Sequence, residues 1–109
     1  MRNKIKENLK FGVLDIIILK VISDSPSYGW DIKKTIEEKS AGFINIPGGS
    51  LYMPLRRLEE KGFVTSNIEV FQGKRYKKIY NITPQGQEWL EIAKEAFYEV
   101  QKGANFIFR

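Results

Sequence analysis

The most concentrated chemistry in this chain is a cluster of cations. It consists of Lys74, Arg75, Lys77 and Lys78, four basic residues within five positions that follow Gly73. Ammonium and guanidinium groups at this density are suited to contact phosphate oxygens. A plainer interpretation is that lysines on an exposed hairpin protect the edge of a sheet from aggregation, but the density exceeds what edge protection needs. The cluster therefore favours binding to a polyanion.

A second group of candidate side chains lies at residues 50–57. Met53, Arg56 and Arg57 fall on the side of a predicted helix opposite its leucines, where they are placed to test the edges of bases. Ser50 and Tyr52 stand at the start of that helix, where backbone N–H groups and the helix dipole favour a phosphate. For these two residues a structural role is an equal alternative, with Ser50 as a helix cap and the Tyr52 ring packed against the preceding helix.

Two aromatic residues, Tyr28 and Trp30, flank Gly29 at the start of another predicted helix. The phenol of Tyr28 could donate a hydrogen bond to a phosphate, because the first turn of this helix would lie against the backbone of bound DNA. Trp30 is expected in or near the core. Glycine in a helix costs about 1 kcal/mol relative to alanine, so Gly29 suggests that another backbone passes close to it.

Several kinds of site are excluded by residue types that the chain lacks. The absence of cysteine and histidine removes disulfides, the usual zinc ligands, histidine general bases and the common nucleophile pairs. The only aspartates are Asp15, Asp24 and Asp31, and no acid/base pair stands out. We therefore expect no enzyme, with no catalytic residue, no metal site and no cofactor.

Length, charge and hydropathy set further limits. A chain of 109 residues can bury one modest core, and its formal net charge of +5 is compatible with polyanion binding without proving it. The apolar run of residues 13–22 is interrupted by Asp15 and Lys20 and is too short to span a membrane, so it predicts a core helix. Since no signal-peptide pattern follows the basic N-terminal residues, a cytoplasmic protein without membrane contact is expected.

Periodicity and punctuation predict the elements that position these residues. Apolar spacing predicts helices over residues 4–23 and 27–39. Ser27 is a plausible cap for the second of these helices. A third helix follows, with Leu51, Leu55 and Leu58 as its buried edge. Pro54 removes a backbone hydrogen bond, so it is tolerable only near the start of that helix.

A hairpin comes after the third helix. Gly62 ends the helix, and strands predicted over residues 63–71 and 75–82 enclose a turn at Gln72-Gly73. This order predicts an α+β fold, mainly α, in which a winged helix-turn-helix has an N-terminal helix and a two-stranded wing. Such a fold places a helix in the major groove and a basic loop on the neighbouring backbone, which makes double-stranded DNA the expected partner.

A final helix begins at Thr83-Pro84, with threonine as cap and proline at the first helical position. Along it, spacings of four and three residues connect Trp89, Ala93, Ala96, Val100, Gly103 and Ile107. Such spacing makes a seam for another helix, so a homodimer is expected. We therefore divide the chain into a DNA-binding domain, residues 1–83, and a dimerisation helix, residues 84–109.

Aromatic residues are frequent on this final helix, and two interpretations of them stay open. The favoured one is that they form the core of the dimer. In the other, two copies of the helix enclose a pocket for a small, flat aromatic effector, lined by Trp89, Ala93, Phe97 and Val100.

Four stretches of the chain together match a known pattern. They are Tyr28-Gly29-Trp30-Asp31-Ile32; Ser50-Leu51-Tyr52-Met53-Pro54-Leu55 with Arg57-Leu58-Glu59 and Gly62; Gly73 with Lys74-Arg75 and Lys77-Lys78; and Tyr80, Ile82-Thr83 and Gly86. In this combined spacing the chain resembles the PadR family of transcriptional regulators over nearly its whole length. Proline at the position of Pro54 is common in that family.

The resemblance implies a dimeric repressor that reads adjacent half-sites of a pseudo-palindromic operator. The length resembles the short subfamily with a single C-terminal dimerisation helix, some members of which bind planar aromatic drugs between subunits through a tryptophan. Here Phe97 stands at that tryptophan's position, and Trp89 lies a little over two turns earlier. Tyr76 also departs from the pattern, since the family often has a basic residue there. The alternative function is a winged-helix protein-interaction module without an effector.

Overall fold

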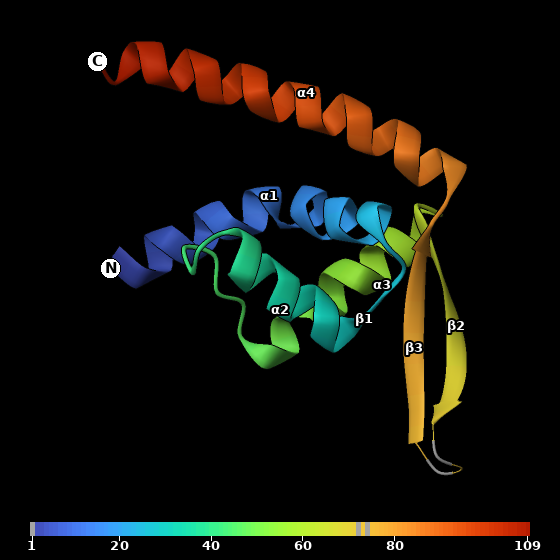
Figure 1. The fold of residues 1–109 in the computed structure, drawn as a ribbon. Coiled ribbons are helices and arrows are strands. Elements are labelled where there is room, and N and C mark those ends of the chain that lie inside the picture. The colour runs from blue at the N-terminus through green and yellow to red at the C-terminus, as the bar shows by residue number, and fades with distance from the viewer. Residues whose placement is uncertain (1, 72, 74) are drawn as a thin grey trace.

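A computed structural model describes residues 2–71, 73 and 75–109 of the chain (Figure 1). Its elements are α1 (Arg2–Asp24), β1 (Ser27–Tyr28), α2 (Gly29–Lys39), the 3₁₀ turn η1 (Gly48–Leu51), α3 (Tyr52–Glu60), β2 (Val64–Phe71), β3 (Arg75–Ile82) and α4 (Pro84–Ile107). The structure is therefore mainly helical with a small antiparallel sheet, in agreement with the fold class expected from the sequence.

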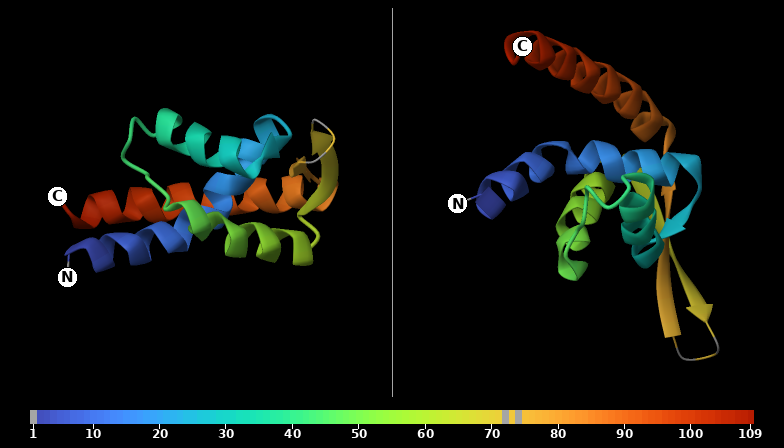
Figure 2. Two further views of the ribbon diagram at one scale, coloured as in Figure 1. Left: turned by 90° about the horizontal axis from the view of Figure 1, so that it is seen from below. Right: turned by 60° about the vertical axis from the view of Figure 1, so that its left-hand side comes forward.

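The long helix α1 forms the middle of the molecule. Figures 1 and 2 show α2, α3 and the wing hairpin on one side of it and α4 on the other. Its residues Ile18, Leu19 and Ile22 are almost completely buried, and they pack with inward side chains of every other helix. The core members are Leu14, Ile18, Leu19, Val21, Ile22, Ile32, Ile36, Ile46, Leu51, Leu55, Leu58, Val64, Tyr80 and Leu90.

The start of α2 differs from the sequence-based expectation. Ser27 does not cap this helix, because Ser27 and Tyr28 form β1 and pair with Tyr80 and Ile79 of β3. Trp30 is not a core residue, since 71% of it is exposed. No backbone passes close to Gly29, where an added Cβ would meet nothing within 4 Å. A local pattern misses β1 because its partner strand lies about 50 residues away in the chain.

The segment before α3 explains how Pro54 is accommodated. The 3₁₀ turn η1 leads directly into α3, and Pro54 is the third residue of α3. In this first turn the missing N–H of proline removes little backbone bonding, and its ring adds to the buried face with Leu55 and Leu58. Gly62, with a φ of +79°, then turns the chain out of the helix.

The wing is a regular antiparallel hairpin. Its register pairs Val64 with Ile82 at the base and Phe71 with Arg75 near the tip, and Gly73 in the turn has a φ of +73°. At the base, β1 pairs with the outer side of β3, so the sheet has three strands in the order β1-β3-β2 instead of the two expected.

The start of α4 is bonded to the end of α3. The hydroxyl of Thr83 accepts a hydrogen bond from the Gly86 N–H at 3.0 Å and donates one to the Gly62 carbonyl at 2.6 Å. Gly86 lies so close to the chain that an added Cβ would be 2.1 Å from the Phe63 carbonyl oxygen. Within the described residues, no helix is long and apolar enough to cross a membrane.

Candidate nucleic-acid interface

The exposed edge of α3 carries three of the residues expected to contact DNA. Tyr52 is 75% exposed and Met53 is 65% exposed, so the alternative in which the Tyr52 ring packs against the preceding helix is wrong. Arg56 is also exposed, and its Nε lies 3.2 Å from Glu60 Oε1 one turn further along the helix. Helix periodicity explains the arrangement, because Leu51, Leu55 and Leu58 lie on the opposite side and are buried in the core.

Arg57 lies in a different environment from Arg56. Its Nη2 is 2.7 Å from Asp15 Oδ1 and its Nε is 3.2 Å from Asp15 Oδ2, a bidentate pair between α3 and α1. The hydrogen bond that Arg57 donates to Asp15 is the main cause that raises the pKa of Arg57 above its ordinary value. A base contact by Arg57 would require this pair to open, so in the free chain the residue is a strut between helices.

Ser50 is half-buried in η1, where its backbone N–H donates to the Pro47 carbonyl at 2.9 Å. Neither η1 nor α3 has a side-chain hydrogen bond at its cap. The cap role offered as an alternative for Ser50 is therefore not observed.

Of the four cations predicted on the wing, the structure describes the side chains of two. Lys77 and Lys78 are both exposed and, as neighbours on β3, they point to opposite faces of the hairpin. Lys77 Nζ lies 5.4 Å from the centre of the Tyr28 ring, a cation–π contact. Lys74 lies outside the described residues, and of Arg75 only the strand backbone is described.

Tyr28 meets a partner that the sequence does not reveal. Its hydroxyl donates a short hydrogen bond to Glu69 Oε2 on β2, across β3 from β1. This bond is the main cause that raises the pKa of Tyr28, with smaller contributions from desolvation and from the charges of Glu69 and Asp31. A phosphate contact by the phenol must therefore compete with Glu69.

Further contacts join α3 to the base of the wing. Ser66 on β2 donates a hydrogen bond to Glu59 Oε2 at 2.5 Å. Nearby Tyr80 is buried, and burial is the main cause that raises its pKa, followed by the charges of Glu59 and Tyr52. Because of these contacts the exposed edge of α3 and the wing are held as one unit.

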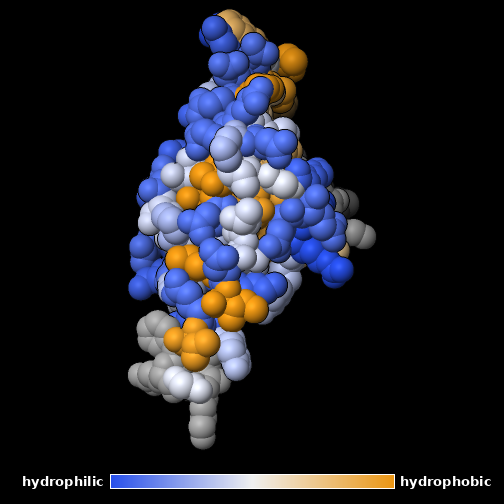
Figure 3. Space-filling model, turned by 90° about the vertical axis from the view of Figure 1, so that its right-hand side faces the viewer, coloured by the Kyte–Doolittle hydropathy of each residue, from blue (hydrophilic) through white to orange (hydrophobic). Residues whose placement is uncertain are grey.

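The wing surface is apolar as well as basic. Ile68, Val70 and Tyr76 are exposed, and the strand register places them on the same face of the hairpin as Lys78. Figure 3 shows apolar patches among hydrophilic ones along the wing above its tip.

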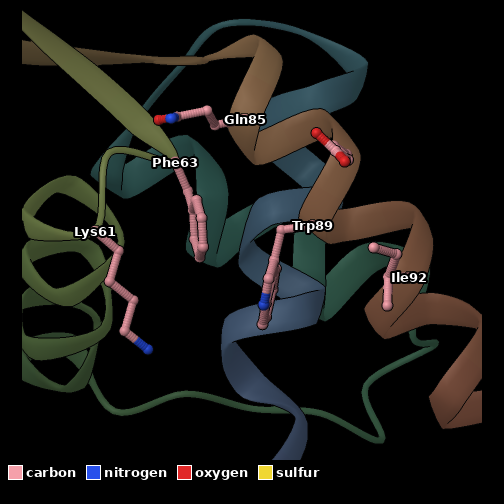
Figure 4. Close-up of a pocket in the computed structure, with 6 residues that line it drawn as sticks. Lys61, Phe63, Gln85, Trp89 and Ile92 are labelled. Atoms are coloured by element: carbon pink, nitrogen blue, oxygen red, sulfur yellow. The ribbon is translucent and has the colours of Figure 1, made fainter.

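Of the four residues of the predicted effector pocket, only Trp89 lines the notch that the structure describes. Trp89 stacks on Phe63 with a ring-centre distance of 5.1 Å, in an open notch of about 290 Å³ (Figure 4). Lys61, Phe63, Gln85, Glu88, Trp89 and Ile92 line this notch. Ala93, Phe97 and Val100 lie further along α4 and outside it.

Comparison with known proteins identifies this arrangement. Residues 18–92, well over half of the chain, match the model of the transcriptional regulator PadR-like family. The chain belongs to this family. A PadR-like protein is a transcriptional regulator and not an enzyme, which confirms both of these expectations from the sequence. No group of side chains suited to hold a metal ion occurs among the residues that the structure describes.

Curated relatives of the PadR-like chain come from several bacteria. It is 29% identical over 92 residues to an uncharacterized protein X of Lysinibacillus sphaericus, covering 84% of each chain. It is 32% identical over 84 residues to the transcriptional regulator YqjI of Escherichia coli K12, and 28% identical over 78 residues to the negative transcriptional regulator PadR of Bacillus subtilis 168. These matches cover 77% and 72% of this chain but only 39% and 43% of YqjI and PadR.

Solved structures share the fold of the PadR-like chain nearly end to end. A transcriptional regulator from Clostridium thermocellum has a TM-score of 0.82 at 28% identity, covering 90% of this chain and 92% of the other. A PadR-like regulator from Bacillus cereus has a TM-score of 0.78 at 25% identity, covering 94% and 97%. Neighbours named as PadR regulators confirm the winged-helix assignment.

Proposed function

We propose that this chain is a dimeric repressor that binds double-stranded DNA in a sequence-specific manner. One observation carries the proposal: the exposed edge of α3, with Tyr52, Met53 and Arg56, lies on the same side of α1 as the wing with Lys77 and Lys78. A helix beside a basic hairpin suits a duplex, because the helix enters the major groove while the hairpin meets the backbone. The Bacillus subtilis relative is named a negative regulator, which supports repression.

In this proposal, different residues provide affinity and specificity. Lys77 and Lys78 supply phosphate contacts that depend little on sequence, together with Lys74 and Arg75. Met53 and Arg56 test base edges, since both are exposed on the outer side of α3. Ser50 and Tyr52 contact phosphates at the start of the helix, and Tyr28 does so when Glu69 releases its hydroxyl. Arg57 acts mainly through its pair with Asp15, which orients α3.

The second half of the proposal concerns assembly. Residues 1–83 form the DNA-binding domain, and residues 84–109 form the dimerisation helix that brings two copies to adjacent half-sites. The exposed apolar side chains along α4, including Val100 and Ile107, support this role, because they have no partner within the described chain.

The proposal includes a small aromatic effector that regulates the dimer. In that case Trp89, Ala93, Phe97 and Val100 of two subunits enclose it, and it favours a dimer whose recognition helices are wrongly spaced for DNA. Adding planar aromatic compounds to the protein bound to its selected operator tests this step. Release of the DNA together with a change in tryptophan fluorescence supports it, and unchanged operator affinity across the compound set opposes it.

The salt dependence of DNA binding tests the central proposal. If the dimer contacts roughly 6 to 10 phosphates, log K falls with log salt at a slope of about −5 to −9. The double variant Lys77→Gln/Lys78→Gln removes four contacts per dimer, so the slope becomes shallower by about 3 to 4. The matched control, Lys94→Gln/Lys102→Gln, removes the same charge from α4 on its side away from the apolar seam and leaves the slope unchanged. DNA affinity that changes neither with salt concentration nor with the wing variant would favour a protein-interaction module instead.

A further inference from the structure

One carboxylate stands in the otherwise basic wing. Residues 61–87 contain five basic residues and a single acidic one, Glu69. The strand register places Glu69 directly opposite Lys77, on one face of the hairpin. A negative charge at this position repels phosphates, so Glu69 opposes the role that we propose for the cations around it.

Glu69 is the centre of a three-residue cluster that joins all three strands of the sheet. Its Oε2 accepts the short hydrogen bond from the hydroxyl of Tyr28 on β1. Tyr28 pairs with Ile79 of β3, which places its ring on the same face as Glu69 and Lys77. Lys77 Nζ lies 5.4 Å from the centre of that ring. In the chain without DNA, two groups proposed to contact phosphates are therefore held in one cluster with a carboxylate.

The contacts of this cluster are of a kind that a phosphate can replace. A carboxylate and a phosphate are both anionic acceptors, and both favour a phenol O–H and an ammonium group as donors. Glu69 and Lys77 are exposed and Tyr28 is half-buried, so water screens the cluster and the exchange costs little free energy. The raised pKa of Tyr28 agrees with this arrangement, because a phenol that donates to an anion holds its proton more tightly.

We propose that Glu69 limits the affinity of the wing for DNA, because it holds Tyr28 and Lys77 in the free chain and a DNA phosphate must displace it. The inference rests on the proposed DNA binding and adds a masking contact that regulates this surface. In the bound state a phosphate oxygen accepts from the Tyr28 hydroxyl in place of Glu69 Oε2. Because every DNA sequence presents phosphates, the contact weakens non-specific binding as well as operator binding.

Glu69→Gln tests the inference, because glutamine keeps the length of the side chain and removes its charge. Operator affinity should rise by about 3- to 10-fold, since each dimer loses two exposed masking contacts of modest strength. Log K should also fall more steeply with log salt, by about 1 to 2 in slope. Fluorescence anisotropy titrations on labelled operator give both quantities. The control Glu95→Gln makes the same charge change on α4, across α1 from the wing, and should alter neither (Figure 1).

The combination with Tyr28→Phe separates a masking contact from a simple effect of charge. In the parent chain this substitution removes both the bond to Glu69 and the phosphate contact, so operator affinity should change by less than about 2-fold. In the Glu69→Gln background mainly the phosphate contact is lost, so affinity should fall by about 3- to 10-fold. Tyr76→Phe is the control, since Tyr76 is exposed on the opposite face of the hairpin, and its effect should be the same in both backgrounds.

Two results would overturn this inference and leave the proposed function intact. Unchanged or lower operator affinity of folded Glu69→Gln protein would mean that Glu69 only braces the wing against β1. Equal effects of Tyr28→Phe in the two backgrounds would mean that Glu69 acts through its charge alone. Absence of DNA binding by the parent chain would overturn the proposed function itself, and this inference with it.

Discussion

Arg57 and Asp15 are 42 positions apart in the chain and yet share two hydrogen bonds. Among the residues that the structure describes, Arg56, the neighbour of Arg57, bonds to Glu60 within its own helix. Two adjacent arginines therefore have different roles, one as a strut between α3 and α1 and the other as a candidate base reader. The sequence places both arginines on the outer side of α3. A helical wheel gives the direction of a side chain but does not reveal which residue of another element it contacts.

A double-mutant cycle measures the coupling free energy between Asp15 and Arg57. Asp15→Asn, Arg57→Gln and the combined variant should show a coupling free energy of about 0.5 to 1 kcal/mol in urea unfolding, modest because the Arg57 side chain is 43% exposed. The Arg56–Glu60 pair is the control, since it is more exposed and confined to one helix. If both cycles give the same coupling, the bidentate geometry adds nothing and Arg57 is free to read bases.

The hydrogen bond between Tyr28 and Glu69 gives a pH dependence of defined sign. The folded pKa of Tyr28 is raised above 10.0, so its contribution to stability is fully present below about pH 10 and is lost as pH rises through the folded value. Tyr28→Phe should therefore unfold at a lower temperature than the parent chain at neutral pH, and the difference should vanish in strong alkali. Tyr76→Phe, at an exposed position, is the control. A difference that persists above the folded pKa would contradict this origin.

At the scale of elements, the junction of α3, β2 and α4 is the most constrained part of the fold. Thr83 bonds to both Gly62 and Gly86, and Phe63 supplies a carbonyl against Gly86 and a ring against Trp89. The angle at which α4 leaves the body is therefore fixed by backbone contacts. In the proposed dimer, the exposed apolar side chains of α4 can pair with a second copy only if that angle is maintained.

Gly86→Ala tests this junction. The added Cβ would lie 2.1 Å from a backbone oxygen, so the chain must shift, and unfolding free energy should fall by roughly 2 to 3 kcal/mol. Gly29→Ala is the matched control, because its Cβ would meet nothing and alanine favours the helix. Denaturant unfolding of the two variants gives the comparison. Equal stabilities would mean that the approach of Phe63 to Gly86 is easily relaxed.

The elements themselves could largely be predicted from local patterns. Leu51, Leu55 and Leu58 give the buried edge of α3, and the Thr83-Pro84 start of α4 has its own capping signal. The error at Ser27 arises because β1 exists only through its pairing with β3. Glu69 and Asp15 are missed for the same reason, since no spacing rule connects residues whose contact depends on the tertiary fold.

At the scale of the whole molecule, α3 and the wing lie on the opposite side of α1 from α4 (Figure 2). The molecule is elongated, with extents of 57 × 32 × 22 Å, because α4 and the wing extend from the compact core. Under the proposed function such a shape separates two tasks, since α4 can pair with a second copy without covering α3. The spacing of the two half-sites is then a property of the dimer and not of either winged helix alone.

Selection of bound fragments from random DNA tests this last step. Two winged helices related by a two-fold axis should select an inverted repeat whose half-site centres lie about one helical turn apart, or a multiple of it. Ile107→Ser should lose affinity for the paired site while keeping the affinity of one subunit for a single half-site, because the change weakens the dimer and leaves α3 and the wing intact. Gel-shift titrations on the paired site and on a half-site separate the two quantities, with Met53→Ala as the opposite control that weakens both. A selected motif without inverted symmetry would show that two copies do not read DNA in this way.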